Sequence, residues 1–220
     1  MKKGVLLAGI AVSVIIGIVA FASTYNNEEI NLDMTRTHGT ISTAMGSSIV
    51  GNPDAEITLV EFGDYQCHFC KKWFDETKPN IIKNYIDAGK VNFVFVDFAF
   101  LGKDSPKAAQ AAYCAEDQGK YWDYHDLLYR SQESQIDGGW ANPERLKAFA
   151  FSLNLDMDLF DNCLDSGKYS KRVQYNTNEG KKQGINSTPG FFIVGPDGQQ
   201  QKISGAQPYS VFKQVIDSMI

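Results

Sequence analysis

The sequence lacks several features that would indicate a metal, haem or nucleic-acid protein. Its one Cys-x-x-Cys pair, Cys67 and Cys70, has no second such pair and no His-x-x-x-His spacing downstream, so a structural zinc site is short of ligands. Lys71 rather than a histidine follows Cys70, which excludes attachment of a c-type haem. The formal net charge is −5, which argues against nucleic acid as a partner. We expect no metal site and no nucleic-acid partner.

The N-terminus carries an export pattern. Lys2 and Lys3 are the only charges before residue 23, residues 5–22 carry none, and a small-x-small site ends this stretch. Residues 1–22 are therefore expected to be a signal peptide, or an N-terminal membrane anchor, because the uncharged stretch just reaches the length that spans a bilayer. Either outcome places residues 23–220 outside the cytoplasm, where disulfides persist.

The rest of the 220 residues is enough for one domain with an insertion or for two small domains. Residues 23–45 show no sustained period and are expected to be a linker with one short strand at residues 39–42, and the folded domain is expected over residues 46–220. Apolar runs predict strands at residues 57–62, 91–96, 191–194 and 200–204. Helical spacing predicts helices at residues 67–87, 105–118, 121–131, 143–153, 156–165, 169–183 and 209–219, and Pro79 is expected to kink the first of them.

The Cys67-His68-Phe69-Cys70 motif is the most informative feature. It follows a strand and opens a helix, so both thiols lie where unpaired N–H groups and the helix dipole favour an anion. We expect Cys67 to ionise below the ordinary thiol pKa and to act as the nucleophile. Cys70, three residues on and on the same helix face, can close a disulfide with Cys67 or resolve a mixed disulfide. His68 is expected to stabilise the thiolate, or to be a plain exposed residue at the helix start.

Three further residues carry predictions of their own. Glu61 lies inside an apolar strand, where a charged carboxyl is costly to bury, so it has either a raised pKa or an exposed position at the edge. Cys114 and Cys163 lie on separate predicted helices, 49 residues apart. They are expected to form a structural disulfide, the alternative being two buried free thiols.

Four segments together resemble the DsbA family of thiol:disulfide oxidoreductases over residues 46–220. They are Gly51-Asn52-Pro53-Asp54-Ala55, the stretch from Asp64 to Cys70, the stretch from Gln118 to His125, and Ser187-Thr188-Pro189-Gly190-Phe191-Phe192. The order of predicted elements is that of an α/β thioredoxin fold with an inserted helical subdomain, here about residues 103–183.

The resemblance implies roles for particular residues. Pro189 is expected to be cis and to lie against the active-site disulfide, while the backbone of Thr188 faces an incoming peptide that adds as a strand. Without the Cys67 motif, Pro189 would be interpreted as an ordinary turn residue. Glu61 is expected to relay protons to Cys70. The chain departs from DsbA in having His68 and Phe69, rather than Pro and His, between the cysteines.

The sequence thus predicts an extracytoplasmic, monomeric enzyme that forms or exchanges disulfides in exported thiol-containing proteins. The Cys67–Cys70 disulfide takes the place of a cofactor. Resemblance implies a quinone-linked membrane partner of the DsbB or vitamin K epoxide reductase type that reoxidises it. The alternatives are a disulfide reductase or isomerase, and a chaperone-like peptide-binding module in which the thiols are incidental.

Overall fold

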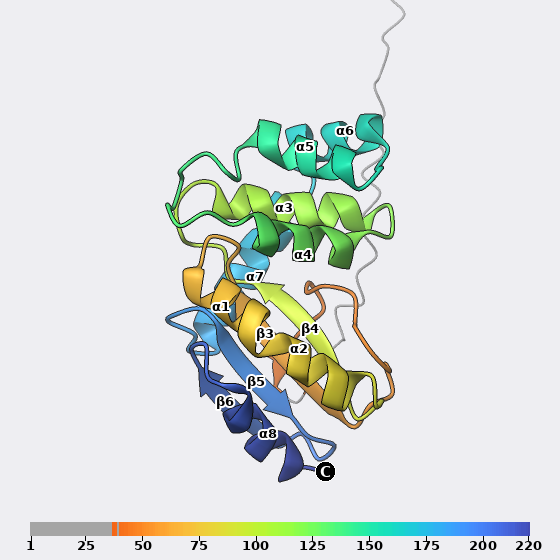
Figure 1. Cartoon of the computed structure of the whole chain (residues 1–220), viewed down its shortest axis with the longest axis vertical. Helices are drawn as coiled ribbons and strands as arrows, with labels where there is room; N and C mark the ends of the chain where they lie inside the picture. The colour runs from red at the N-terminus through yellow and green to blue at the C-terminus, as the bar shows by residue number, and fades with distance from the viewer. Residues whose placement is uncertain (1–36, 39) are drawn as a thin grey trace, which may run out of the picture. The chain divides into compact units, whose positions relative to one another are not determined.

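The computed structural model describes residues 37–38 and 40–220, and its main sheet has four strands, of which the two longest are neighbours (Figure 1). Across the sheet the strands are β4 (Val91–Asp97), β3 (Ile57–Gly63), β5 (Gly190–Val194) and β6 (Gln200–Ser204). β3 and β4 are parallel, with Ile57 opposite Val91, and β5 and β6 follow antiparallel. Every residue of β3 and β4 is buried, which explains their continuous apolar sequence.

The helix after the cysteine motif is broken into three pieces. They are α1 (His68–Glu76), α2 (Lys78–Ile81) and the π-helical turn η1 (Ile82–Ile86). The single helix predicted over residues 67–87 is therefore interrupted at Thr77, shortly before Pro79. Proline has no N–H, and its ring clashes with the carbonyl four residues earlier, which accounts for the position of the break. The Thr77 hydroxyl donates to the carbonyl of Gln207 at 3.0 Å, which fixes the break against the C-terminal region.

Helices cover both faces of the sheet. On one face, visible in Figure 1, lie α1, α2 and α8 (Tyr209–Asp217), and Trp73 of α1 packs against the sheet and against α8. Its ring centroid lies 4.7 Å from that of Phe191 and 5.9 Å from that of Phe212. On the other face α7 (Ser170–Lys182) passes so close that a side chain in place of Gly180 would come within 2.6 Å of the Phe98 ring.

A block of helices separates β4 from β5. It consists of α3 (Ser105–Glu116), α4 (Tyr121–Ser131), α5 (Pro143–Ser152), α6 (Met157–Ser166) and α7. Each of these helices overlaps a predicted one, with ends that differ by at most two residues. Strand, helix, strand, helical block, hairpin and helix follow one another in the predicted order.

Cys114 and Cys163 are bonded to each other, with an S–S distance of 2.02 Å. The bond joins α3 to α6 across 49 residues of chain. Both cysteines are buried, at 1% and 7% exposure. The disulfide therefore ties the helical block together from within.

The segment before the sheet is packed onto the domain. A two-stranded sheet pairs β1 (Thr37–His38) with β2 (Ile41–Ser42). Arg172 donates to the carbonyls of Met45 and Gly46 at 2.9 and 2.5 Å, and the Ile41 side chain is fully buried. Residues 41–45, expected at the end of the linker, thus lie against the folded domain, because their carbonyls find donors there.

The signal peptide or anchor predicted for residues 1–22 lies outside the described residues. Among the helices of residues 37–38 and 40–220, none has the length and apolar character needed to cross a membrane.

The disulfide generates the first testable prediction. Replacing both Cys114 and Cys163 by alanine frees the unfolded chain from a long loop, which lowers the free energy of unfolding by about 4 kcal/mol in the loop-entropy description. For a domain of this size the melting temperature should fall by roughly 10 °C, measured by circular dichroism. Disulfide exchange at Cys67 should stay within about twofold of wild type, since neither sulfur lies at a helix N-terminus that would activate it. Lost exchange in a folded double variant would instead make this pair a second redox centre.

Candidate active site

Cys67 is the N-cap of α1. It follows β3 by way of a tight turn in which its N–H donates to the carbonyl of Asp64 at 3.0 Å. Its backbone is extended, with φ −81° and ψ 115°, and its sulfur accepts from the N–H of Cys70 at 3.4 Å. A sulfur in this place takes the position that a serine or aspartate oxygen occupies in an ordinary N-cap.

The surroundings of Cys67 favour its thiolate. They lower its pKa to about 6, first through a hydrogen bond from the Cys70 thiol and against the opposing effect of burial. A hydrogen bond from the Thr188 side chain and hydrogen bonds from the N–H groups of Cys70 and Phe69 lower the pKa further. Because this pKa lies below 7, the deprotonated form of Cys67 predominates at neutral pH.

Cys70 has the opposite properties. Its side chain is fully buried, and burial is the first cause that raises its pKa well above the ordinary thiol value. The hydrogen bond to Cys67 and the nearby charges of Cys67 and Glu61 raise it further. Both cysteines are free, so the structure holds the dithiol form. At neutral pH Cys67 is thus the nucleophilic thiolate, while Cys70 remains a protonated thiol.

Glu61 lies within β3 at 1% exposure. Burial raises its pKa to about 8, while the positive charge of Lys78 lowers it and the Cys67 thiolate raises it again. Its Oε1 has no hydrogen-bond partner among the described residues. Of the two positions that the sequence left open, the structure has the buried one. Glu61 is therefore mostly protonated at neutral pH and loses its proton in the mildly alkaline range.

Thr188 lies against Cys67, although 121 residues separate the two in the chain. The peptide bond between Thr188 and Pro189 is cis, as expected. In the dithiol form the Cys67 thiol reaches the carbonyl oxygen of Thr188, with Sγ and O 3.3 Å apart. The backbone of residue 188 is consequently next to the reactive sulfur.

The structure places His68 differently from the other predicted site residues. Its side chain is exposed and stacks edge-on with Phe69, the two ring centroids being 6.1 Å apart. The hydrogen bonds that lower the pKa of Cys67 involve Cys70, Phe69 and Thr188. The stabilising role expected for His68 thus stays a prediction.

A groove of about 400 Å³ opens beside Cys67. Cys67, Phe69 and Thr188 line it together with two loop residues, Phe100 between β4 and α3 and Ile136 between α4 and α5. The apolar side chains are unusually open to solvent, at 59% for Phe69, 44% for Phe100 and 46% for Ile136. Exposed apolar groups gathered around a reactive sulfur are typical of a binding surface rather than of a core.

The chain is similar to known proteins over most of its length. The family model described as thioredoxin matches residues 43–218. The chain belongs to the thioredoxin family. Disulfide bond formation protein D of Bacillus subtilis (strain 168) is 33% identical over 151 residues, which cover 67% of this chain and 68% of that protein.

Solved structures agree with this assignment. The crystal structure of oxidised BdbD from Bacillus subtilis has a TM-score of 0.73 at 30% identity, covering 83% of this chain and 97% of that one. For alpha-DsbA1 of Wolbachia pipientis the TM-score is 0.69 at 28% identity, covering 78% of this chain and 89% of that one. The thioredoxin fold with an inserted helical subdomain is thereby confirmed, and the chain is a DsbA-type protein disulfide oxidoreductase.

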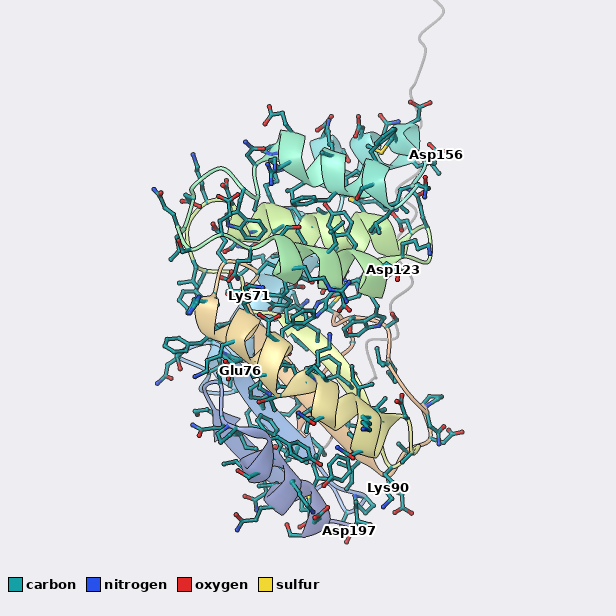
Figure 2. All side chains as sticks on the ribbon, viewed as in Figure 1. Lys71, Glu76, Lys90, Asp123, Asp156 and Asp197 are labelled. Carbon is teal, nitrogen blue, oxygen red and sulfur yellow. A yellow bond between two sulfur atoms is a disulfide. The ribbon has the colours of Figure 1, made fainter. Side chains whose placement is uncertain are left out.

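The site of this oxidoreductase includes a buried lysine that the sequence did not reveal. Lys78, at 6% exposure, donates to Asp126 at 3.1 Å and lies 4.7 Å from the centre of the Phe74 ring. Burial lowers its pKa, while Asp126 and Glu61 counteract that effect. Nothing in its local sequence distinguishes Lys78 from an exposed lysine, because its burial comes from α4 packing over α2. Lys71, which Figure 2 labels on α1, also reaches α4, because its Nζ donates to the carbonyl of Tyr129 at 2.9 Å.

The thiol pair generates the second prediction. If the hydrogen bond from Cys70 is the main cause of the low Cys67 pKa, Cys70→Ala should raise that pKa by about one to two units, the worth of one hydrogen bond to a charged group. Cys70→Ser should raise it less, because the hydroxyl still donates. The measurement is the ultraviolet absorbance of the thiolate as a function of pH. A Cys67 pKa that is unchanged in Cys70→Ala would show that Thr188 and the backbone N–H groups stabilise the thiolate without Cys70.

Proposed function

We propose that this oxidoreductase forms or exchanges disulfide bonds in exported proteins outside the cytoplasm, through a redox centre made of Cys67 and Cys70. The division of properties between the two thiols carries the proposal. Cys67 is ionised and borders an open groove, whereas Cys70 is buried and protonated. Thiol–disulfide exchange requires this combination of one nucleophilic sulfur and one resolving sulfur.

The oxidising reaction balances with these two sulfurs alone. A substrate thiolate attacks the Cys67 sulfur, a substrate–Cys67 disulfide forms, the Cys67–Cys70 bond breaks, and Cys70 leaves and takes up a proton. A second substrate thiolate then attacks the substrate sulfur of that mixed disulfide and releases Cys67 as a thiolate. The substrate loses two electrons, the enzyme gains them, and the low pKa of Cys67 makes it a good leaving group.

Glu61 is the proton carrier for Cys70 in this proposal. It is buried, it contributes to the raised pKa of Cys70, and its own pKa of about 8 lets it hold or release a proton near neutrality. When Cys70 leaves, Glu61 supplies the proton, and when Cys70 attacks, Glu61 accepts it. Lys78 belongs to the same buried set of charges and limits how far the Glu61 pKa can rise.

Thr188 and Pro189 hold the substrate backbone next to Cys67. The Thr188 carbonyl lies within 3.3 Å of the sulfur, so a peptide chain that pairs with residue 188 has its cysteine at the reacting atom. The apolar groove side chains then receive residues that flank this cysteine. A protein substrate with exposed thiols fits this surface.

The reduced enzyme must pass two electrons on before it can oxidise a second substrate. We assign that step to a quinone-linked membrane partner of the DsbB or vitamin K epoxide reductase type. The export pattern of residues 1–22 supports a location at the outer face of the membrane or beyond it, where such a partner is accessible.

Trapping of mixed disulfides tests the proposed roles of the cysteines. Cys70→Ser should accumulate a covalent substrate adduct through Cys67, because the resolving thiol is gone, and the adduct should disappear on reduction. Cys67→Ser should form no adduct and exchange no disulfides. Non-reducing electrophoresis with a cysteine-containing protein substrate detects the adducts. Adducts in both single variants would contradict this division of roles.

A pH profile tests Glu61. In the dithiol form its carboxylate fraction rises with pH through about 8, so resolution by Cys70 should accelerate over that range as Glu61 becomes able to accept the proton. Glu61→Gln keeps the shape but cannot accept it, so the rate at pH 8 should fall roughly a hundredfold and the inflection should vanish. Stopped-flow oxidation of the dithiol enzyme by a disulfide gives the rates. Glu76→Gln, an exposed carboxyl on α1 (Figure 2), is the matched control, and an unchanged inflection in Glu61→Gln would rule out the proton transfer.

A further inference from the structure

Gln66, one residue before Cys67, is paired with Asp137 from the loop between α4 and α5. The Gln66 Nε2 donates to Asp137 Oδ1 at 3.0 Å, and the Asp137 N–H donates back to Gln66 Oε1 at 2.8 Å. The Gln66 side chain is 4% exposed, and its Nε2 also donates to the carbonyl of Leu101 at 2.6 Å. Because the Nε2 of this buried amide donates and its Oε1 accepts, the amide group can adopt only one orientation.

Asp137 extends this pairing to a second loop. Its Oδ2 accepts from the N–H of Lys103 at 3.0 Å, and its Oδ1 accepts from the N–H of Asp104 at 3.1 Å. The backbone at residue 102 passes so close that a side chain there would clash with the Asp137 carboxylate, and Gly102 has φ +73°. Both oxygens of Asp137 are therefore committed to donors from two different segments.

The segments joined in this way are the ones that carry the apolar groove residues. Phe100 lies two residues before Gly102, and Ile136 directly precedes Asp137. Asp64 fixes the Phe100 end further, because its Oδ2 accepts from the N–H of Phe100 at 2.9 Å. Phe100 and Ile136 both lie outside helices and strands, where no regular backbone ladder orders them. The hydrogen bonds made by Asp64, Gln66 and Asp137 therefore order the two loops that carry them.

We propose that Gln66 and Asp137 are positioning residues for protein substrates, and that their pairing holds Phe100 and Ile136 as one apolar wall of the groove beside Cys67. The inference rests on the proposed use of that groove by substrates. The inference assigns to the enzyme a preference for protein substrates that have apolar side chains near the reacting cysteine, because the wall contacts those side chains. A small thiol such as glutathione reacts at Cys67 without needing the wall.

Preorganisation is the physical reason for such a pairing. If two loops have to become ordered when a substrate binds, the loss of their conformational entropy weakens binding. Loops that are already ordered in the free enzyme avoid this loss. Because the pairing touches neither sulfur of the redox pair, its loss should weaken substrate binding and leave the sulfur chemistry in place.

Asp137→Asn tests the inference. Both Asp137 oxygens accept hydrogen bonds, so an amide places a donor against a donor in either orientation. The KM for oxidation of a reduced peptide with leucine and phenylalanine beside its cysteines should rise about tenfold. The second-order rate with glutathione and the reduction potential should stay within about twofold of wild type. Glu133→Gln removes a carboxylate from the same loop, one whose nearest ion-pair partner, Arg145, is 4.0 Å away, and should change neither constant.

A double-mutant cycle distinguishes an effect of Asp137 that acts through the position of Ile136 from a general loss of order in the loop. If Asp137 acts through Ile136, then Asp137→Asn in an Ile136→Ala background should raise the peptide KM less than about threefold beyond the single Ile136→Ala change. Should Asp137→Asn fail to fold by circular dichroism, Gln66→Met removes the same pairing from the other side and is measured in its place.

An unchanged peptide KM in a folded variant, or peptide and glutathione rates that fall together, would overturn the inference while leaving the proposed function intact. If the wild-type enzyme oxidised neither peptide nor glutathione, the proposed function would fail, and the inference would fail with it.

Discussion

Every element of the site depends on the immobility of β3. This strand is hydrogen-bonded to β4 along one edge and to β5 along the other, and all seven of its residues are buried. Glu61 extends from it into the interior, Asp64 follows its end, and Cys67 is reached three residues later. A strand paired on both edges cannot shift without breaking two ladders at once, so the start of α1 and its N-cap sulfur are fixed relative to the sheet.

Burial, rather than any single ion pair, sets the protonation of the site. It is the first cause of the raised pKa of Glu61, of the raised pKa of Cys70 and of the lowered pKa of Lys78. Only at Cys67, among these four groups, do hydrogen bonds outweigh it. Among these four groups, Cys67 alone has its pKa shifted toward the charged form, while the pKa values of Glu61, Cys70 and Lys78 are shifted toward their neutral forms.

The inserted helices contribute to the active site. Through α4 they supply Asp126 to Lys78, and through their loops they supply Phe100 and Ile136 to the groove. The disulfide between Cys114 and Cys163 keeps α3 and α6 together. In the proposed function, the thioredoxin fold supplies the reactive cysteine and the backbone of residue 188, and the apolar side chains of the groove supply the contacts that a protein chain makes and a small thiol does not.

Local patterns in the sequence are sufficient to predict several features of this protein. Largely apolar runs predict β3 and β4, Pro79 predicts a kinked helix, and the position of Cys67 after a strand and before a helix predicts its place at a helix N-terminus, because each depends on residues close together in the chain. The resemblance to DsbA predicts the cis bond before Pro189, which the structure has, and it suggests the role proposed for Glu61. Three contacts emerge only from the folded chain: Thr188 lies 3.3 Å from Cys67 Sγ, Lys78 is buried beneath α4, and Asp137 pairs with Gln66 across 71 residues. Those contacts, and the pKa values that follow from burial, depend on how distant elements pack, and no local pattern of apolar and polar residues encodes that packing.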